Sequence, residues 1–288
     1  MIYHLSLLSF GDNLISLALL ARLRDKTGVT IVGTSLTARL TPFLPNLDIP
    51  LMVVSEDVPA FYDVRKRGMR AAVRDALRVR RSLARETTPG DGLIFEKSGW
   101  RQLLLAGGMG RRSWAPARRR NVYEDRRDML SAVFGEGIAL EDTPRLTAFP
   151  RTVTINPASR LAEKAVSPDA LATIVRHLRE RSVDVRLIDP EERHRALRPV
   201  VTSYHAGTTL EEAVALVATS DLYIGADSLF VHVAYHCRRP MLVLYNETNL
   251  YFAPPGVAEQ GSYVAFVARM SERELQSALD ERMARIAP

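Results

Sequence analysis

Cysteine is almost absent from this sequence, which contains a single one, Cys237. An intramolecular disulfide is therefore impossible, and a cysteine-rich zinc site is excluded. No apolar run approaches the roughly 20 residues that cross a bilayer, and the first residues lack a basic leader followed by a small-residue cleavage site. We therefore expect a cytoplasmic protein that is neither secreted nor membrane-spanning.

Three well-known motifs are missing as well. The sequence has no complete G-x-G-x-x-G after a strand, no G-x-x-x-x-G-K-[ST] and no H-E-x-x-H. Dinucleotide oxidoreduction, P-loop hydrolysis and zincin chemistry accordingly lose support. The segment LAGGMGRR places glycines near arginines, but it follows a helical pattern and so lacks the context that a phosphate-binding loop requires.

Length and composition favour a globular protein of two domains. The chain has 288 residues, more than one hydrophobic core usually serves, with 47% hydrophobic and 25% charged residues. Its net charge of +6 comes mainly from arginines that cluster between Arg65 and Arg127. Such a cluster could attract anionic lipid, a phosphorylated acceptor or nucleic acid, or simply be a solvated surface. We expect no nucleic-acid partner, because no recognition motif or interleaved aromatic residues accompany the arginines.

Predicted strands and helices alternate along both halves of the chain. In the first half, strands are expected near residues 2–8, 29–33, 51–54 and 90–96, and in the second near 152–156, 183–189, 222–225 and 241–245. The composition changes at residues 144–150, which read as a linker. The fold class is therefore α/β, with two Rossmann-like doubly wound domains at residues 1–148 and 149–288.

One predicted helix, at residues 63–85, is strongly basic. Its apolar residues are expected on a single face, with arginines over the remainder; they are Met69, Val73, Ala76, Leu77 and Leu83.

In open parallel sheets, ligands bind where the carboxyl ends of strands meet loops and helix N-termini. Asp12 follows the first strand and could remove a proton from an acceptor hydroxyl. The alternative is that Asp12 caps the next helix, a position that aspartate favours.

Two further strand exits carry polar groups. Asn156 and Ser159, followed by Lys164, could cradle a pyrophosphate, although Lys164 could equally be a surface lysine. Asp227 and Ser228 begin a helix whose free N–H groups can bind phosphate, with His232 about one turn inside. The alternative here is that Asp227 and Ser228 are helix caps and that His232 is packed in the core.

Three segments in order carry a family resemblance: SFGDNLISLALLARLR, INPASRLAEKAVSPDALATIVRHLRE and TTLEEAVALVATSDLYIGADSLFVHVAYHCRRPMLVLYNET. With them the chain resembles the bacterial ADP-heptose:lipopolysaccharide heptosyltransferases and their wider glycosyltransferase family. The resemblance extends over the C-terminal half, and in the N-terminal half it is confined to the loop at Gly11 and Asp12 and the helix that follows.

The resemblance implies a GT-B fold, in which two Rossmann-like domains face a central cleft and the acceptor meets the N-terminal domain. It implies inversion at the transferred sugar, no metal ion and no cofactor. By resemblance Asp12 is the general base, with Gly11 and Asn13 on the acceptor side. The implied donor-binding residues are Asn156, Ser159, Lys164, Asp227, Ser228, His232 and Thr248.

The sequence departs from the family pattern at the donor motifs. Leu229 and Phe230 stand where a small residue is usual, Ala-Val follows Lys164, and Asn246-Glu247-Thr248 replaces a Gly-Pro-Thr loop. An ADP-sugar is the favoured donor. A relative that uses another nucleotide sugar for capsule, O-antigen or another glycoconjugate is the alternative.

We therefore expect an enzyme of lipopolysaccharide or polysaccharide biosynthesis that transfers heptose or a related sugar from a nucleotide sugar to a lipid- or polysaccharide-linked acceptor. The basic helix at 63–85 could hold it peripherally on the anionic inner-membrane face. Two alternatives stay open: a nucleotide-sugar epimerase or hydrolase with the same donor site, and a catalytically silent binding subunit whose donor site Leu229 and Phe230 close.

Overall fold

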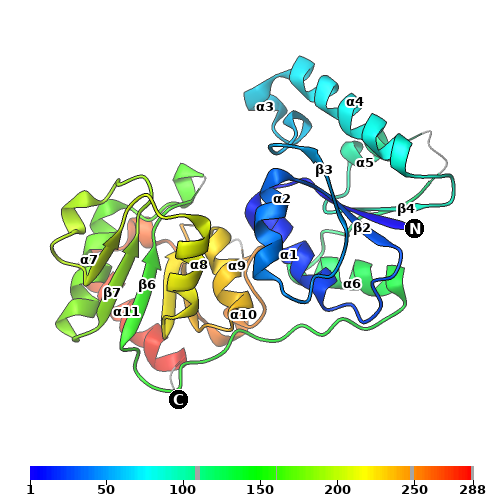
Figure 1. Ribbon diagram of the computed structural model, residues 1–288. Helices are drawn as coiled ribbons and strands as arrows, with labels where there is room; N and C mark the ends of the chain where they lie inside the picture. The colour runs from blue at the N-terminus through cyan, green and yellow to red at the C-terminus, as the bar shows by residue number, and fades with distance from the viewer. Residues whose placement is uncertain (108–110, 160, 247–249, 287–288) are drawn as a thin grey trace. The chain divides into compact units, whose positions relative to one another are not determined.

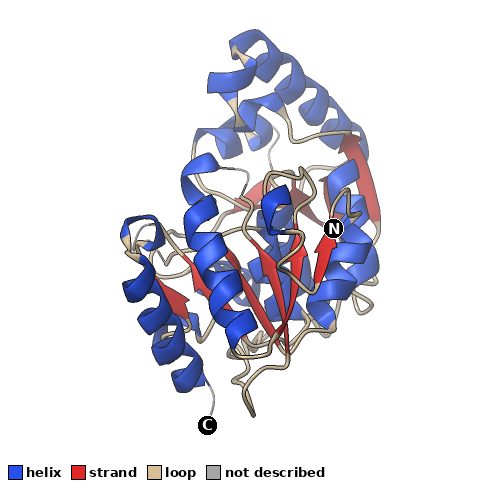
Figure 2. Cartoon of the chain, turned by 90° about the vertical axis from the view of Figure 1, so that its left-hand side faces the viewer, coloured by secondary structure: helices blue, strands red, loops and turns tan. Residues whose placement is uncertain are grey.

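The computed structural model describes residues 1–107, 111–159, 161–246 and 250–286. The chain divides into two compact units, Met1–Leu140 (unit 1) and Glu141–Pro288 (unit 2). Each unit has its own parallel sheet with helices on both faces (Figures 1 and 2). This is the α/β organisation that the alternation of strands and helices predicts.

The sheet of unit 1 has five parallel strands in the order β3-β2-β1-β4-β5. The strands are β1 (Ile2–Ser6), β2 (Val29–Thr34), β3 (Leu51–Ser55), β4 (Gly92–Phe95) and β5 (Arg112–Trp114). The chain starts in the middle of the sheet, moves outward to β3 and then crosses back to β4. Since β1 pairs with both β2 and β4, the direction of winding reverses between β1 and β4.

Helices α1 (Phe10–Ala21), α2 (Ser35–Leu40) and α6 (Val122–Phe134) cover one face of this sheet (Figure 1). The other face is covered by α4 (Met69–Glu86) and α5 (Trp100–Ala106). Val79 and Leu83 of α4 pack there against Leu5 of the central strand, so the core lies between α4 and the sheet.

The basic segment 63–85 differs from its prediction in two ways. It is broken into α3 (Val64–Arg67) and α4 at Gly68, whose φ of 80° suits glycine and interrupts a helix. Its apolar residues also divide between two faces. Ala76 and Leu83 are buried, whereas Met69, Val73 and Leu77 are exposed by 66%, 51% and 47%.

The sheet of unit 2 has six parallel strands in the order β11-β10-β9-β6-β7-β8. The strands are β6 (Thr152–Asn156), β7 (Asp184–Ile188), β8 (Ser203–His205), β9 (Leu222–Ala226), β10 (Met241–Leu244) and β11 (Tyr263–Val264). Counted from β6, this is the 3-2-1-4-5-6 order of the dinucleotide-binding fold, with its reversal between β6 and β9.

Helices α7 (Pro168–Glu180) and α11 (Glu272–Ile286) pack together on one face of the second sheet. On the other face lie α8 (Leu210–Ala218), α9 (Leu229–His236) and the short α10 (Val257–Gln260) (Figure 1). Two of these helices begin with side-chain caps: Ser167 accepts a hydrogen bond from the Ala170 N–H, and Thr209 forms a capping box with Glu212. Within the described ranges, no helix has the length and apolarity to cross a bilayer.

Candidate functional site

The predicted site residues gather at the two points where the winding of a sheet reverses. Asp12 follows β1 in unit 1, and Lys164 and Asp227 follow β6 and β9 in unit 2. At such a reversal the loops of adjacent strands diverge to opposite faces and leave room for a ligand at the carboxyl edge of the sheet.

In unit 2 an ion pair joins the exits of β6 and β9. Lys164 ends a short 3-10 turn, Ala162–Lys164, and its Nζ lies 2.5 Å from Oδ2 of Asp227. Both side chains line a hollow of about 240 Å³, together with Glu163, Leu244, Tyr245 and Asn246. Lys164 is therefore not isolated: it is paired with Asp227, and its side chain is 24% exposed.

The loop after β6 is held by its own polar side chains. Asn156 is buried at the end of β6, where its Oδ1 accepts a hydrogen bond from the Ala158 N–H at 3.1 Å. The Ser159 hydroxyl donates to the backbone carbonyl of Asp227 at 3.3 Å. Three residues predicted from two separate motifs, Ser159, Lys164 and Asp227, are thus in direct contact.

The exit of β9 leads from Asp227 directly into the N-terminus of α9. Ser228 occupies the N-cap position, without a capping hydrogen bond from its side chain. Leu229 and Phe230 follow it, both partly exposed, and His232 is buried within the helix. Thr248 lies outside the described residues.

Gly225 and Asn246 fix the geometry of the strand exits around this hollow. A Cβ at Gly225 would lie 2.8 Å from the carbonyl oxygen of Asn156, so only glycine lets β9 approach β6 this closely. Asn246 donates from Nδ2 to the backbone carbonyls of Glu163 and Ala165, at 2.8 and 3.1 Å. It therefore ties the turn that carries Lys164 to the exit of β10.

In unit 1, Asp12 lies in the first turn of α1, and Ser9 is the N-cap residue. Asp12 is therefore not the N-cap residue, but its carboxylate lies in the first turn, where it interacts favourably with the helix dipole. Arg126 of α6 donates to Asp12 Oδ1 at 2.9 Å and to the Asp12 backbone carbonyl. Lys97 Nζ lies 3.7 Å from Oδ2, which also accepts from the Ser9 hydroxyl at 3.1 Å. Two cations therefore stabilise the Asp12 carboxylate.

The two neighbours of Asp12 have different surroundings. Gly11 is the second residue of α1. Asn13 is fully buried: its Oδ1 accepts from the Leu8 N–H at 3.2 Å, and its Nδ2 donates to Thr37 Oγ1 at 3.0 Å. The Asn13 amide thus connects α1 to α2 and the end of β1.

Glu96 is a buried carboxyl group beside Asp12 that the sequence analysis does not identify. It follows β4, is 2% exposed, and accepts a hydrogen bond from the Leu8 N–H at 3.3 Å. Burial raises the pKa of Glu96 to about 7, because the charge of Arg126 only partly offsets the loss of water and the charge of Asp12 adds to the rise.

His4 completes this cluster from the central strand. Burial, together with the nearby charge of Arg126, lowers the pKa of His4 to about 3. His4 is therefore neutral at neutral pH, and its Nδ1 lies 3.1 Å from the Ser6 hydroxyl oxygen. In the part of the chain that the structure describes, no three His, Cys, Asp or Glu side chains are grouped so that they could hold a metal ion.

Solved structures of several bacterial transferases have this fold. The Escherichia coli heptosyltransferase WaaC, solved with ADP, matches with a TM-score of 0.68 and 14% identity over 98% of this chain and 99% of its own. A family 9 glycosyltransferase from Veillonella parvula DSM 2008 matches with a TM-score of 0.66 and 16% identity over 98% and 97%. The E. coli ADP-heptose lipopolysaccharide heptosyltransferase II matches with a TM-score of 0.59 and 13% identity over 99% of this chain and 98% of its own.

These likenesses confirm the predicted fold class, two Rossmann-like α/β units of the GT-B type. A comparison with curated protein sequences finds no significant match. The model of glycosyltransferase family 9 (heptosyltransferase) matches residues 138–281, half of the 288 residues. The matched region contains both motifs that meet in the hollow of unit 2. The chain therefore belongs to glycosyltransferase family 9, the heptosyltransferase family.

Proposed function

We propose that this protein transfers heptose or a related sugar from a nucleotide-sugar donor to a hydroxyl group of a bacterial glycoconjugate, with inversion and without a metal ion or cofactor. The observation that carries the proposal is the hollow in unit 2, where Lys164 and Asp227 meet at the winding reversal beside the N-terminus of α9. WaaC, which has the same fold, has been solved with ADP and with ADP-2-deoxy-2-fluoro heptose, and an ADP-sugar is accordingly the favoured donor.

Lys164 is the cation that would neutralise negative charge on the diphosphate of the donor. A diphosphate entering the hollow brings negative charge next to Asp227, so the ammonium group would turn from that carboxylate to the phosphate oxygens. The free N–H groups at the start of α9 offer a second favourable interaction with phosphate. Both would stabilise the charge that develops on the departing diphosphate in the transition state.

Asp12 is the proposed general base. Its carboxylate takes the proton of the acceptor hydroxyl while that oxygen bonds to the anomeric carbon and the bond from this carbon to the diphosphate breaks. Attack from the side opposite the leaving group inverts the anomeric configuration. The products are the extended glycoside and a nucleoside diphosphate, with the proton on Asp12.

A thermal-shift panel of nucleoside diphosphates and nucleotide sugars tests the proposal, because a ligand of the native state raises the melting temperature. We expect stabilisation by ADP and ADP-heptose. Selective stabilisation by UDP, GDP or CMP compounds would support the proposed donor site but would show that the donor carries a different nucleotide. A folded sample that responds to no member of the panel would favour the silent binding subunit. Release of free sugar or an epimer without an acceptor would favour the hydrolase or epimerase.

Replacing Lys164 by alanine should weaken donor binding more than it lowers the maximal rate. A hydrogen bond to a charged partner contributes about 1.5–3 kcal/mol, so the Kd of ADP should rise about 10- to 100-fold. Isothermal titration of ADP measures the change. Lys164→Arg keeps the charge and should retain most of the affinity.

A matched control for this variant is Arg176→Ala, which removes a half-exposed cation paired with Glu272 elsewhere in unit 2. It should leave the Kd of ADP unchanged. Equal affinities of Lys164→Ala and the wild type for ADP would remove Lys164 from the donor site.

We also propose that the outer face of α4 rests on anionic lipid at the inner-membrane face, where a lipid-linked acceptor would be found. Met69, Val73 and Leu77 are exposed and, at a spacing of four residues, form one stripe. Arg70, Arg74 and Arg81 border it and line the same shallow hollow of about 460 Å³. An apolar stripe bordered by arginines is typical of helices that lie in the membrane interface.

The membrane proposal predicts strong binding to vesicles of phosphatidylcholine and phosphatidylglycerol at 3:1, and much weaker binding to phosphatidylcholine alone. Each arginine near an anionic surface contributes about 1 kcal/mol, so changing Arg70 and Arg74 to glutamine should lower the partition coefficient about 30-fold. Cosedimentation measures it. Val200→Thr, at an exposed apolar residue of unit 2, is the control. Unchanged partitioning of the double variant would exclude α4 as the docking face.

A further inference from the structure

Two carboxyl groups and one buried guanidinium group meet in unit 1, and the proposed transfer uses only one of the carboxyl groups. Arg126 of α6 is 1% exposed, and Glu96, which follows β4, is 2% exposed. Arg126 lies 2.9 Å from Oδ1 of Asp12. An unpaired charge in a protein interior is strongly destabilising, so Arg126 needs a carboxylate partner. Asp12 is that partner in this structure, and Glu96 is a second candidate for the same cation.

The Leu8 N–H holds Glu96 beside the first turn of α1. It donates to Glu96 Oε2 at 3.3 Å and to Asn13 Oδ1 at 3.2 Å. Asn13 directly follows Asp12 and is itself fully buried. One backbone N–H group therefore links the exit of β4 to the turn that carries the proposed base.

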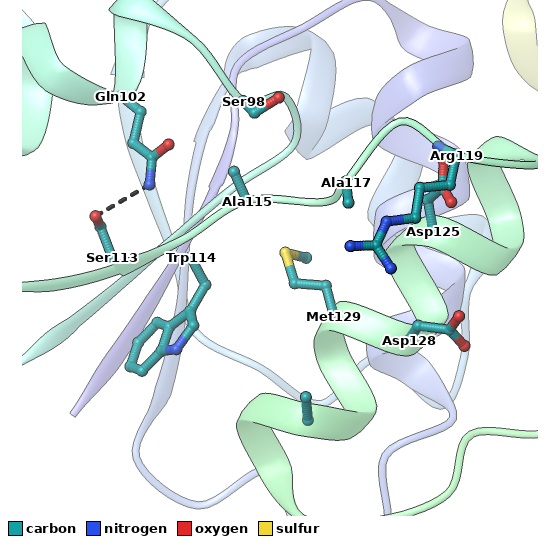
Figure 3. A pocket seen from close by; sticks show the side chains of 11 residues that line it. Ser98, Gln102, Ser113, Trp114, Ala115, Ala117, Arg119, Asp125, Asp128 and Met129 are labelled. Atoms are coloured by element: carbon teal, nitrogen blue, oxygen red, sulfur yellow. Dashed lines mark hydrogen bonds between the residues drawn. The ribbon is translucent and has the colours of Figure 1, made fainter.

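Arg126 is fixed in this cluster by its guanidinium group and by its helix. The guanidinium donates to Asp12 and, at 2.9 Å, to the hydroxyl of Ser16, one turn further along α1. Asp125, the preceding residue, accepts from the backbone N–H of Arg119 at 3.0 Å and so fixes the start of α6. Figure 3 shows Arg119 and Asp125 next to each other. A second carboxylate that pairs with Arg126 must therefore do so within the cluster.

Arg126 and Glu96 each bury a polar atom that has no partner. Among the residues that the structure describes, Arg126 Nε and Glu96 Oε1 make no hydrogen bond. Buried polar atoms are nearly always paired, and an exception calls for an explanation. The cluster thus contains an unused donor and an unused acceptor, which are the groups that a second ion pair needs.

The groups around Glu96 act on its charge in opposite directions. Burial raises its pKa most, Arg126 lowers it, Asp12 raises it, and the Ser16 hydroxyl and Lys97 lower it, which leaves a pKa of about 7. Glu96 is therefore protonated in mildly acidic solution, and it gives its proton to water as the pH rises through 7.

The interaction between two carboxyl groups is mutual. Because the charge of Asp12 disfavours ionisation of Glu96, the charge of an ionised Glu96 must favour the protonated form of Asp12 by the same free energy. His4 of β1 also lies near Arg126, but burial and the charge of Arg126 lower its pKa to about 3. His4 therefore contributes no change of charge near pH 7, whereas Glu96 does.

We infer that Glu96 is a positioning residue for the proposed transfer: once ionised, it shares Arg126 with Asp12 and makes Asp12 a stronger acceptor for the proton of the acceptor hydroxyl. The inference rests on the proposed function, in which Asp12 is the base. Glu96 itself touches no substrate, and the proton of the acceptor hydroxyl still goes to Asp12.

Carbon-13 NMR of protein labelled at the glutamate carboxyl carbons tests the inference. The signal of Glu96 is the one that Glu96→Gln lacks, and in the wild type it should titrate near pH 7. In Asp12→Asn it should titrate about one pH unit lower or more, because the charge of Asp12 is gone and Arg126 is free to pair with Glu96. Asp48→Asn, at an exposed carboxylate of unit 1, should not shift it.

Labelling of the aspartate carboxyl carbons gives a second readout on the wild-type protein. The signal of Asp12, identified by its absence in Asp12→Asn, should change at the pH where Glu96 titrates, and this change should be missing in Glu96→Gln. An Asp12 signal that does not respond to that titration would overturn the inference. A Glu96 titration that is the same in Asp12→Asn and the wild type would also overturn it.

Turnover separates this inference from the proposed function. With ADP-heptose as donor and deacylated lipopolysaccharide as acceptor, kcat should rise about three- to tenfold more between pH 6 and 8 in the wild type than in Glu96→Gln, since one pKa unit is tenfold in proton affinity. Parallel pH profiles, in an enzyme that needs Asp12, would overturn the inference alone. Full turnover of Asp12→Asn would instead overturn the proposed role of Asp12 as the base.

Discussion

Asp12→Asn should leave the fold and donor binding intact and lower turnover about 10²- to 10⁴-fold, the usual contribution of a positioned general base. Asparagine keeps an oxygen that can accept the hydrogen bond from Arg126, so the first turn of α1 should hold its place. The amide cannot accept the proton of the acceptor hydroxyl. The expected signature is a much lower kcat with an unchanged Kd for ADP and an unchanged melting temperature.

Asp48→Asn is the matched control for this variant, because Asp48 is an exposed carboxylate of unit 1. Its turnover should equal that of the wild type. Full activity of Asp12→Asn would reject Asp12 as the base. A fall in melting temperature that accompanies the loss of activity would instead assign Asp12 a structural part in the cluster with Arg126 and Lys97.

The sequence predicts the sheets well because their central strands are continuous apolar runs followed by polar exits. That pattern locates Asp12, Lys164 and Asp227 at strand ends, which is where the structure has them. The short edge strands β5, β8 and β11 have two or three residues each. A run of that length has no periodicity to detect, and it forms only because a neighbouring strand offers hydrogen-bond partners.

The partners of Asp12 could not be identified in the same way. Arg126 is one of many arginines between residues 65 and 127, and nothing local distinguishes it from those on the surface. Its burial, at 1% exposure, follows from the packing of α6 against α1. Glu96 likewise looks like the polar end of a strand. Only the pairing of β4 with β1 brings it to the same cluster.

The basic helix shows a different limit of sequence patterns. Met69 and Val73 are each followed three residues later by a buried alanine, Ala72 and Ala76, so an exposed stripe and a buried stripe share one broad apolar pattern. The helical repeat alone cannot separate the stripe that packs on the sheet from the stripe that remains exposed. The split depends on where the sheet lies, and that is a property of the tertiary fold.

Glu96→Gln should stabilise the protein at pH 8 and leave its stability nearly unchanged at pH 4.5. Burial raises the pKa of Glu96 from the ordinary 4.5 to about 7, so the folded state retains a proton that the unfolded state releases. Stability from this group is therefore full below about pH 4.5 and is lost as the pH rises through 7. Glutamine resembles the protonated acid and avoids that loss, which is on the order of 3 kcal/mol above pH 7.

Urea unfolding of the wild type and the variant between pH 4.5 and 8, followed in unit 1 by tryptophan fluorescence, measures this difference. Both tryptophans, Trp100 and Trp114, lie in that unit. Glu86→Gln, at an exposed glutamate, should shift the curve little at any pH. Of the charged groups around Glu96, Arg126 and Lys97 favour its carboxylate, whereas Asp12 disfavours it. A variant less stable than the wild type at pH 8 would therefore mean that the two cations outweigh burial and that Glu96 is ionised in the native protein.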